Sequence, residues 1–246
     1  MYDIHGNLPA LEAVLEEVRR TGVNQIIVGG DVFPGPMPRE TLECLLAVQI
    51  RTLFIHGNGD REVLAQMRGT ETEWFRSAHE SLRAPVRWTA EQLANSYEAV
   101  LAAWPADIRV HIEGPGDVLF CHATPRNDAE CFTRQTPDDR LVAVFDGVRA
   151  SMVVCGHTHM QFDRTIGDYR VVNAGSVGMP FGDPGAYWLL LGPEVQLRVT
   201  PYDLPAAGER IRRTSYPQAD DFAARHVLQP PSEVEMLELF ARADLK

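Results

Sequence analysis

Side chains of the kind that bind metal ions occur in five short stretches of this 246-residue chain. In chain order the stretches read DIH, GGD, GNGD, CHATP and GHTH. They contribute the candidate ligands Asp3, His5, Asp31, Asn58, His122, His157 and His159, and GNGD also carries Asp60. Imidazole nitrogens combined with carboxylate and amide oxygens suit divalent transition metals such as Mn, Fe, Co, Ni or Zn better than Ca or Mg. These ligands are too many for one ion, and two ions about 3.5–4 Å apart, bridged by one carboxylate and a hydroxide, would use them all.

Each stretch, taken singly, also has an ordinary structural explanation. A lone D-x-H is typical of a capped helix start, GGD is a common turn, and His122 could be a buried histidine with satisfied hydrogen bonds. Two imidazoles one residue apart, as in His157 and His159, are more specific because they suit a turn that bends around a metal. Five such stretches rarely occur in this order by chance, and together they indicate a metal site.

The five stretches fall at the ends of predicted strands, which is where α/β sheets build their sites. Apolar runs predict strands over residues 24–31, 51–60, 107–114, 117–125, 150–160, 169–178, 186–192 and 195–203. Apolar residues at helical spacing predict a helix that Asn7 caps and Gly22 ends, a second helix over 38–48, mainly helical structure over 62–105, and a C-terminal helix over 231–246 that starts with a Ser232/Glu235 capping box. The alternation of strands and helices in the first part is typical of βα units with a parallel sheet.

Composition limits the class of protein. With 246 residues and 45% hydrophobic side chains, the chain can bury one substantial core, and we expect residues 1–246 to form a single α/β domain. The formal net charge of −11 and the lack of a basic run argue against general nucleic-acid binding. Four cysteines without C-x-x-C spacing, no basic apolar leader and no apolar run of membrane-spanning length lead us to expect a cytoplasmic protein that does not enter membranes.

The five stretches together resemble the motif series of the calcineurin-like metallophosphoesterase superfamily, which reads D-x-H, GD, GN-x-D or GN-x-E, H, and GH-x-H. The resemblance runs from Asp3 to about Tyr202, and segments such as IHGNLPALEAVL, RWTAEQL and NAGSVGMP look like the small bacterial and archaeal phosphodiesterases of that superfamily. It implies a four-layer αββα sandwich whose first strand is missing or very short here.

The resemblance also implies a role for each candidate residue. It implies that one ion is held by Asp3, His5 and His159, that the other is held by Asn58, His122 and His157, and that Asp31 bridges them. A hydroxide between the two ions would attack phosphorus in line. Asn58 would also help to hold the phosphoryl group, and Asp60 would orient its neighbours.

Gly59 departs from the family pattern. Many members read GNHD or GNHE, with the histidine proposed to protonate the leaving group, whereas the third residue here is Gly59. General acid catalysis contributes about 10²–10⁴-fold, so its absence favours substrates with better leaving groups or a water as the donor. His56 could take over the role, or it could be an ordinary packed or solvated histidine.

The opening of the chain is a second departure. Family members begin with an apolar strand that leads into D-x-H, and only Met1 and Tyr2 precede Asp3 here. Either the start was assigned too far downstream or the anchoring strand is absent. Because chain ends are poorly ordered unless tied down, we expect Asp3 and His5 to be loosely held and their ion to be weaker or absent, with the other site better held.

These features predict a metal-dependent phosphoesterase, more specifically a phosphodiesterase that acts on a small phosphorylated compound. Manganese is the expected metal, with Fe, Ni, Co or Zn as alternatives. Arg61 and Arg126 adjoin ligand stretches and could contact phosphate, or they could be ordinary solvated or ion-paired arginines. A catalytically weak scaffold or binding protein with the same fold, for which a retromer subunit sets a precedent, and a phosphomonoesterase are the alternatives.

Overall fold

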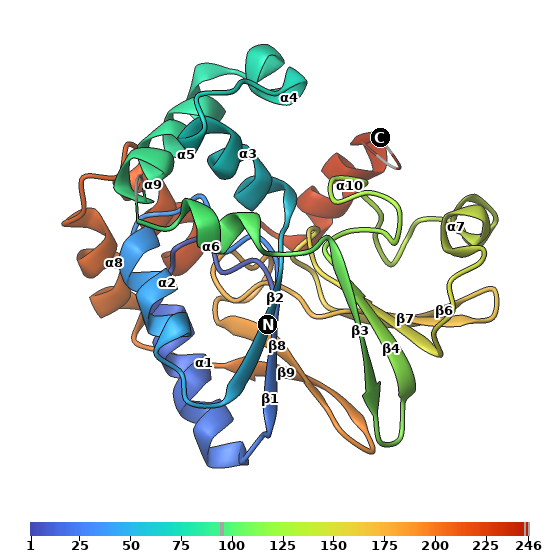
Figure 1. The fold of residues 1–246 in the computed structure, drawn as a ribbon. Coiled ribbons are helices and arrows are strands. Elements are labelled where there is room, and N and C mark those ends of the chain that lie inside the picture. Colours follow the sequence, from blue (N-terminus) through green and yellow to red (C-terminus); the bar gives the residue numbers. More distant parts are fainter. Residues whose placement is uncertain (94–95, 244, 246) are drawn as a thin grey trace.

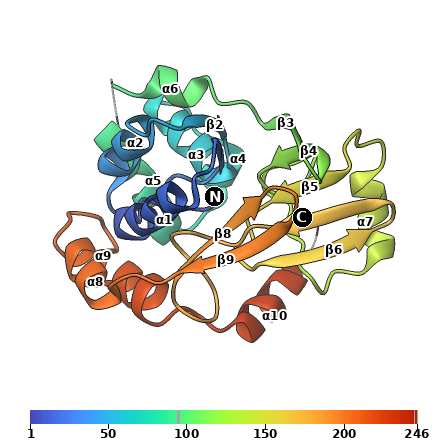
Figure 2. The same cartoon turned by 90° about the horizontal axis from the view of Figure 1, so that it is seen from below.

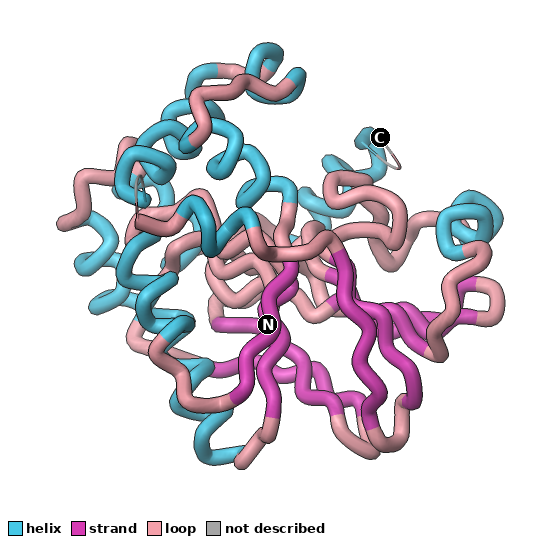
Figure 3. The backbone as a smooth tube through the Cα atoms, in the orientation of Figure 1, coloured by secondary structure: helices cyan, strands magenta, loops and turns pink. Residues whose placement is uncertain are grey.

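Two layers of β-strands lie face to face, and helices cover the outer side of each layer (Figures 1 and 2). The computed structural model describes residues 1–93, 96–243 and 245. The strands are β1 (Gln25–Gly29), β2 (Arg51–Ile55), β3 (Asp107–Ile112), β4 (Gly116–Cys121), β5 (Met152–Cys155), β6 (Phe162–Ile166), β7 (Tyr169–Asn173), β8 (Ala186–Leu191) and β9 (Val195–Thr200). Figure 3 shows how the loops gather at the ends of these strands.

The helices lie outside the strands and between them in the chain. They are α1 (Leu8–Thr21), α2 (Pro38–Leu46), α3 (Asn58–Met67), α4 (Glu73–Ser77), α5 (Glu80–Leu93), α6 (Glu98–Ala102), α7 (Asp138–Phe145), α8 (Leu204–Arg212), α9 (Ala219–Phe222), the π-helix η1 (Ala223–Leu228) and α10 (Glu233–Ala243). None of the described helices combines the length and the apolar character that crossing a bilayer requires.

Three apolar cores define the four layers. One core lies between the helices, above all α1 and α2, and the layer of β1 and β8. A second core lies between the two sheets and includes Tyr2, Phe120 and Val154, and a third packs α7 against the five-stranded sheet. The predicted αββα sandwich is therefore confirmed.

Strand pairing brings segments that are distant in sequence to one end of the sandwich. The five-stranded sheet has the order β3-β4-β5-β7-β6, in which β4, β5 and β7 are parallel. In the other layer β1 pairs with β2 in parallel, and β8 pairs with β9 in antiparallel fashion. Because β1, β2, β4 and β5 each lead into a ligand-bearing loop, their carboxyl ends can place these loops together.

Local capping follows the sequence. Asn7 caps α1 by accepting a hydrogen bond from the Ala10 N–H (3.3 Å), and Gly22 ends the helix with a left-handed φ of 71°. The Ser232/Glu235 capping box is also present before α10. These predictions are confirmed, whereas the boundaries of a single domain over residues 1–246 stay a prediction.

The opening segment, residues 1–6, has no assigned strand, as predicted, but it is not loose. Its backbone is hydrogen-bonded along β1 and the loop that follows β1, through the pairs Met1–Ile27, Met1–Gly29, Asp3–Gly30 and His5–Asp31, at 2.9–3.0 Å. On its other side, the Val177 N–H donates to the Tyr2 carbonyl and the Gly178 N–H donates to the Asp3 carbonyl, both at 3.0 Å. The expectation of loosely held Asp3 and His5 was therefore wrong, because two neighbouring segments fix their backbone without a preceding strand.

Candidate metal centre

The ligand-type side chains are brought together at one end of the sandwich by loops from both sheets. Asp3 and His5 lie in the opening segment, Asp31 after β1, Asn58 and Asp60 in the first turn of α3, His122 after β4, and His157 and His159 after β5. They form two groups of three residues whose ligand atoms lie within 4.8 Å of one another. We call the group of Asp3, His5 and His159 site A, and the group of Asp31, His122 and His157 site B.

Site A joins the opening segment to the loop after β5. The Nε2 atoms of His5 and His159 are 3.4 Å apart, and His159 Nε2 is 3.3 Å from Asp3 Oδ1. All three residues are buried. Asp3 Oδ1 is buried without a hydrogen-bond partner in the described part of the chain, which is costly for a carboxylate oxygen unless a cation neutralises it.

Asn58 lies beside site B. With its amide nitrogen toward the site, it donates to His122 Nε2 (3.2 Å), His157 Nδ1 (3.0 Å) and the Asp128 carbonyl (3.1 Å). With the amide reversed, its oxygen faces the same two ring nitrogens. A cation bound between this amide oxygen and the two ring nitrogens would favour the reversed orientation of Asn58, because oxygen and imidazole nitrogen are both good ligands of divalent transition metals.

Asp31 lies between the two sites. Its Oδ2 is 3.7 Å from His5 Nε2 in site A, and its Oδ1 is 3.5 Å from His122 Nε2 in site B. Asp3 Oδ1 also lies 3.8 Å from His122 Nε2, so the sites adjoin. A carboxylate with one oxygen toward each site is the arrangement that bridges two closely spaced ions.

All four imidazoles are oriented by backbone carbonyls on their far sides. The pairs are His5 Nδ1 with Pro34 O (3.2 Å), His122 Nδ1 with Gly29 O (2.9 Å), His157 Nε2 with Ala129 O (3.1 Å), and His159 Nδ1 with Met179 O (2.7 Å). A carbonyl can only accept, so each of these ring nitrogens carries a proton, and the other nitrogen faces the centre, where it can offer a lone pair to a cation once it is deprotonated. The donor set therefore fits bound cations.

The backbone of these ligands adopts an unusual conformation. Asp3, His5, Asp31, His157 and His159 all have left-handed φ values, between 46° and 65°. Leu245 is the remaining non-glycine residue with positive φ among those described. Such conformations cost on the order of 1 kcal/mol each and persist where the surrounding structure holds them, typically at functional sites.

Charges within the centre shift its pKa values in the metal-free protein. Burial lowers the pKa of His122, but the carboxylates of Asp31 and Asp3 outweigh burial and raise it to about 10. Burial lowers the pKa of His157 to about 4 and also lowers that of His5. His5 and His157 are thus neutral at pH 7, whereas a cation entering site B would have to displace the proton of His122.

Asp60 supports the centre from behind. Its carboxylate accepts hydrogen bonds from the Gly57 N–H (2.9 Å) and the Phe33 N–H (3.0 Å), which ties the start of α3 to the loop after β1. A further hydrogen bond joins the start of α3 to the loop after β1, because the Gly59 N–H donates to Asp31 Oδ1 at 2.8 Å. Burial and the nearby Asp31 charge raise the pKa of Asp60 to about 8. Asp60 thus positions the loops that carry the ligands.

Gly59 is required by its surroundings. A Cβ atom at this position would lie 2.3 Å from the Phe33 carbonyl oxygen and 3.1 Å from Asp31 Oδ1. The histidine that many family members carry here therefore cannot be accommodated unless the backbone of the loop after β1 shifts. The conformation of this loop therefore leaves no room for a side chain at position 59.

The nearby arginines and His56 are engaged with acidic side chains. Arg61 donates to both carboxylate oxygens of Asp128, at 2.8 and 3.0 Å, and to Glu62 at 3.0 Å. His56 Nδ1 lies 3.6 Å from the same Asp128. Arg126 donates to Glu130, at 2.7–3.0 Å, with the head of its side chain half exposed. The ion-paired alternative that the sequence left open for both arginines is the arrangement that the structure has.

Several neighbours of the centre were not anticipated from the sequence. Asp128 contributes its carbonyl to Asn58, Cys131 Sγ lies 3.4 Å from His157 Nε2, and the Phe181 ring stacks on His159 with centroids 5.2 Å apart. His226, in η1, has a buried Nδ1 without a partner among the described residues. Asp128 and Cys131 follow the CHATP stretch closely, which is the one sequence signal that could have drawn attention to them.

The fold and the two sites define a class of protein. The family model of the calcineurin-like phosphoesterase superfamily domain matches residues 1–192, so the chain belongs to this superfamily. Its relatives place it in the branch of this superfamily that includes small bacterial and archaeal proteins.

Particular relatives support this assignment. The chain is 26% identical to an uncharacterized protein of Methanocaldococcus jannaschii over 236 residues, which cover 88% of this chain and 92% of that protein. It is also 26% identical to the phosphodiesterase YfcE of Escherichia coli K12 over 198 residues, which cover 76% of this chain and 83% of YfcE.

Two solved structures share the fold. A hypothetical protein of Pyrococcus horikoshii superposes with a TM-score of 0.78 at 22% identity, covering 94% of this chain and 98% of that one. A metallophosphoesterase of Sphaerobacter thermophilus superposes with a TM-score of 0.67 at 23% identity, covering 91% and 97%. At these identities the likeness concerns the fold.

Proposed function

We propose that this protein is a phosphodiesterase that requires two divalent transition-metal ions, most suitably manganese, and hydrolyses a small phosphorylated compound in the cytoplasm. The observation that carries the proposal is the position of Asp31, with one carboxylate oxygen toward His5 of site A and the other toward His122 of site B. Similarity to the phosphodiesterase YfcE supports the reaction type. The orientation of the four imidazoles supports the metal requirement.

The residues of this chain would hold and orient the reactants. Divalent cations, when bound here, would lower the pKa of a coordinated water and neutralise charge on the phosphoryl group. Asp31 and Asp3 would balance the charge of the cations, and Asn58 would direct its amide toward the phosphoryl oxygens at the edge of site B. Asp60 would keep Asn58 in place through the hydrogen bonds of its carboxylate to the two loop N–H groups.

The charge around the centre favours a diester over a monoester. A monoester is a dianion near neutral pH and calls for cationic contacts in addition to the metals. The two neighbouring arginines, Arg61 and Arg126, are already paired with three carboxylates, those of Asp128, Glu62 and Glu130. These five side chains have a net charge of −1. They therefore repel a dianionic monoester more strongly than a diester, which carries a single negative charge.

The backbone strain argues for an enzyme and against a scaffold with the same fold. Five candidate ligands in left-handed conformations together cost several kcal/mol, at on the order of 1 kcal/mol each. A protein that only binds partners through its surface would gain nothing from this cost. A working metal site uses it to fix the directions of the ligands.

Hydrolysis of two p-nitrophenyl substrates tests the proposal. Protein stripped with a chelator and reloaded with Mn²⁺ should hydrolyse bis-p-nitrophenyl phosphate faster than p-nitrophenyl phosphate. His122→Ala should lose this turnover, and His111→Ala should retain it, because His111 is an exposed histidine of β3. Absence of turnover with Mn²⁺, Fe²⁺, Co²⁺, Ni²⁺ and Zn²⁺ would favour the scaffold. Faster turnover of the monoester would favour a phosphomonoesterase.

A further inference from the structure

A short loop between β4 and α7, residues 124–131, presents two consecutive backbone carbonyls to side chains at site B. The Asp128 carbonyl oxygen lies 3.1 Å from the terminal amide of Asn58. The Ala129 carbonyl accepts a hydrogen bond from the Nε2–H of His157 at 3.1 Å. The position of this loop, the 124–131 loop, therefore determines how the His157 ring is directed and what the Asn58 amide faces.

Hydrogen bonds within the 124–131 loop make it a closed unit. The Thr124 N–H donates to the Asn127 carbonyl at 2.9 Å, and the Ala129 N–H donates to Asn127 Oδ1 at 2.7 Å. The buried carboxylate of Glu130 accepts hydrogen bonds from the Thr124 hydroxyl at 2.7 Å and from the Arg126 guanidinium. A displacement of one part of the loop is therefore passed on to the carbonyls that face site B.

Arg61 fastens this loop to α3. Its guanidinium donates to both carboxylate oxygens of Asp128, at 2.8 and 3.0 Å, in the planar arrangement of two bonds that a lysine cannot reproduce. A third hydrogen bond, to Glu62 at 3.0 Å, holds the guanidinium from the side of the helix. Only 16% of the Asp128 side chain is exposed, so the pair is screened less than a pair on the open surface.

The helix α3 carries both Asn58 and Arg61. Positions three apart lie on the same side of a helix, so Asn58 can face the imidazoles of site B while Arg61 reaches the neighbouring loop. The pair of Arg61 with Asp128 therefore sets the separation between α3 and the 124–131 loop. It also sets the width of site B between Asn58 and His157.

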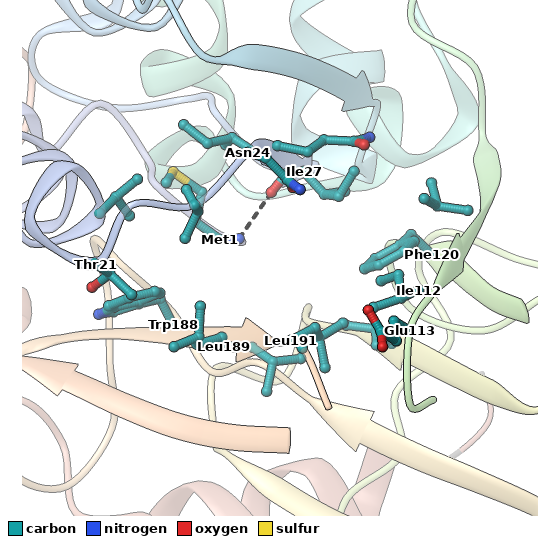
Figure 4. A pocket seen from close by; sticks show the side chains of 18 of the residues that line it. Met1, Thr21, Asn24, Ile27, Ile112, Glu113, Phe120, Trp188, Leu189 and Leu191 are labelled. Carbon is teal, nitrogen blue, oxygen red and sulfur yellow. Dashed lines mark hydrogen bonds between the residues drawn. The ribbon is translucent and has the colours of Figure 1, made fainter. Parts of the chain in front are cut away.

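The candidate ligands of site A have a separate support. Two of them lie in the opening segment, which is anchored where the Met1 amino group donates to the Ile27 carbonyl at 2.9 Å, as the dashed line in Figure 4 shows. The third, His159, donates its Nδ1–H to the Met179 carbonyl at 2.7 Å. These anchors belong to β1 and to the loop between β7 and β8, so a change in the 124–131 loop should leave site A in place.

We infer that Arg61 is a positioning residue of site B, which holds the 124–131 loop against α3 so that His157 keeps its direction toward a bound cation. Arg61 thus acts through Asp128 and the Ala129 carbonyl, without contact to the phosphoryl group. The inference rests on the proposed two-ion centre. It adds that site B depends on a support that site A does not share.

The affinity for Mn²⁺ tests this inference in two variants that each keep a single site. His159→Ala leaves site B intact, and His157→Ala leaves site A intact. Added to His159→Ala, Arg61→Met should weaken the binding of Mn²⁺ about tenfold in isothermal titration, the lower end of the range for loss of an outer hydrogen-bond partner. Added to His157→Ala, the same substitution should leave the affinity unchanged.

Two further substitutions show whether the contact with Asp128 is what matters. Arg61→Lys keeps the charge without the pair of parallel hydrogen bonds and should recover part of the affinity of site B. Arg61→Met combined with Asp128→Asn should weaken site B no more than Arg61→Met alone, because both remove the same contact. Arg170→Met is the matched control, since this arginine donates two hydrogen bonds to Asp163 on the strands β6 and β7, and it should change neither affinity.

Amide hydrogen exchange tests the loop in metal-free protein that retains every candidate ligand. The Ala129 N–H is bonded inside the 124–131 loop, so it should exchange severalfold faster in Arg61→Met than in the unmodified protein or in Arg170→Met. Unchanged exchange of this N–H would mean that Arg61 does not hold the loop, and the inference would fail.

Turnover separates a positioning role from contact with the substrate. Excess Mn²⁺ should restore diester hydrolysis by Arg61→Met, because mass action compensates for weaker binding of the ion. A raised KM for the diester that persists at saturating Mn²⁺ would show contact with phosphate and would overturn the inference. So would an equal loss of affinity at both sites, or no loss at either. If neither His159→Ala nor His157→Ala binds Mn²⁺ before Arg61 is changed, the two-ion centre itself is refuted, and the inference falls with it.

Discussion

The Nε2 atoms of His5 and His159 lie 3.4 Å apart although 154 positions separate the two residues in the chain. Each ring donates its Nδ1–H to a backbone carbonyl, that of Pro34 for His5 and that of Met179 for His159. Both lone pairs therefore point into the same space, beside the buried Oδ1 of Asp3. Three electron-rich atoms so close together repel one another unless a proton or a cation lies between them, which makes site A a candidate site for a cation.

Removal of one ligand from each site should remove one ion selectively. His159→Ala should lower the affinity for the ion of site A, and His157→Ala the affinity for the ion of site B, each by more than the roughly 10–100-fold that loss of an outer hydrogen-bond partner costs. Metal analysis after dialysis should find two Mn²⁺ per chain in the unmodified protein and about one in each variant. A single ion in the unmodified protein would contradict the two-ion arrangement.

Asp31→Asn should affect both ions, because this carboxylate faces both sites. The substitution keeps the shape of the side chain and removes its charge. It should weaken both ions at once, whereas Asp117→Asn, in the exposed pair with His111, serves as a control that leaves both in place.

The sequence predicted the candidate ligands that the fold brings together, because each lies in a short motif with fixed spacing, and it predicted the layers because apolar runs alternate with helical patterns. It did not predict what holds the imidazoles, since the carbonyls of Gly29, Ala129 and Met179 carry no sequence signature. The same holds for the opening segment. Its anchoring depends on backbone hydrogen bonds to Val177 and Gly178, which only the folded chain brings near.

The strain in the ligand loops can be measured with a matched pair of substitutions. His157 has a φ of 65°, a conformation that glycine adopts readily and alanine does not. In metal-free protein, His157→Gly should therefore be more stable than His157→Ala, by about 1 kcal/mol. Urea unfolding of the two variants measures the difference. Equal stabilities would show that the left-handed conformation costs nothing here.

Gly59→His should not restore a proton donor. The Cβ atom would lie 2.3 Å from the Phe33 carbonyl oxygen, so even Gly59→Ala should destabilise the protein, by about 1–3 kcal/mol. Gly192→Ala is the control, because nothing lies within 4 Å of a Cβ atom at that position. Both Gly59 variants should unfold at a lower urea concentration than the unmodified protein, and both should hydrolyse the diester more slowly. Higher activity of Gly59→His would show that the backbone of the loop after β1 shifts to accommodate the new side chain.

Asp128→Asn should shift the preference toward monoesters. It weakens the hold on Arg61, whose guanidinium donates two hydrogen bonds to this carboxylate. The freed cation can contribute up to about 1 kcal/mol to binding a dianion, the upper end for an exposed ion pair. The ratio of monoester to diester turnover should therefore rise up to about fivefold. Asp163→Asn, which breaks a pair with Arg170 between β6 and β7, should leave the ratio unchanged.

His226 should make the metal-free protein sensitive to acid. Burial lowers the pKa of this imidazole to about 3, with smaller contributions from the charges of His159 and His5, whereas an unfolded chain has a histidine pKa of about 6.5. Between these pH values the unfolded state binds more protons than the folded state. The stabilisation is therefore complete above pH 6.5 and is lost as the pH falls toward 3, by at most about 1.4 kcal/mol per pH unit.

His226→Phe removes this titration and keeps a ring beside Phe222. Urea unfolding at pH 7 and pH 5 should show a smaller loss of stability in the variant than in the unmodified protein, with a difference of up to about 2 kcal/mol. His79→Phe replaces an exposed histidine and should retain the full loss. If His226→Phe and the unmodified protein lose stability in parallel, His226 gains a proton in the folded state and its environment is more polar than its buried, unpartnered Nδ1 indicates.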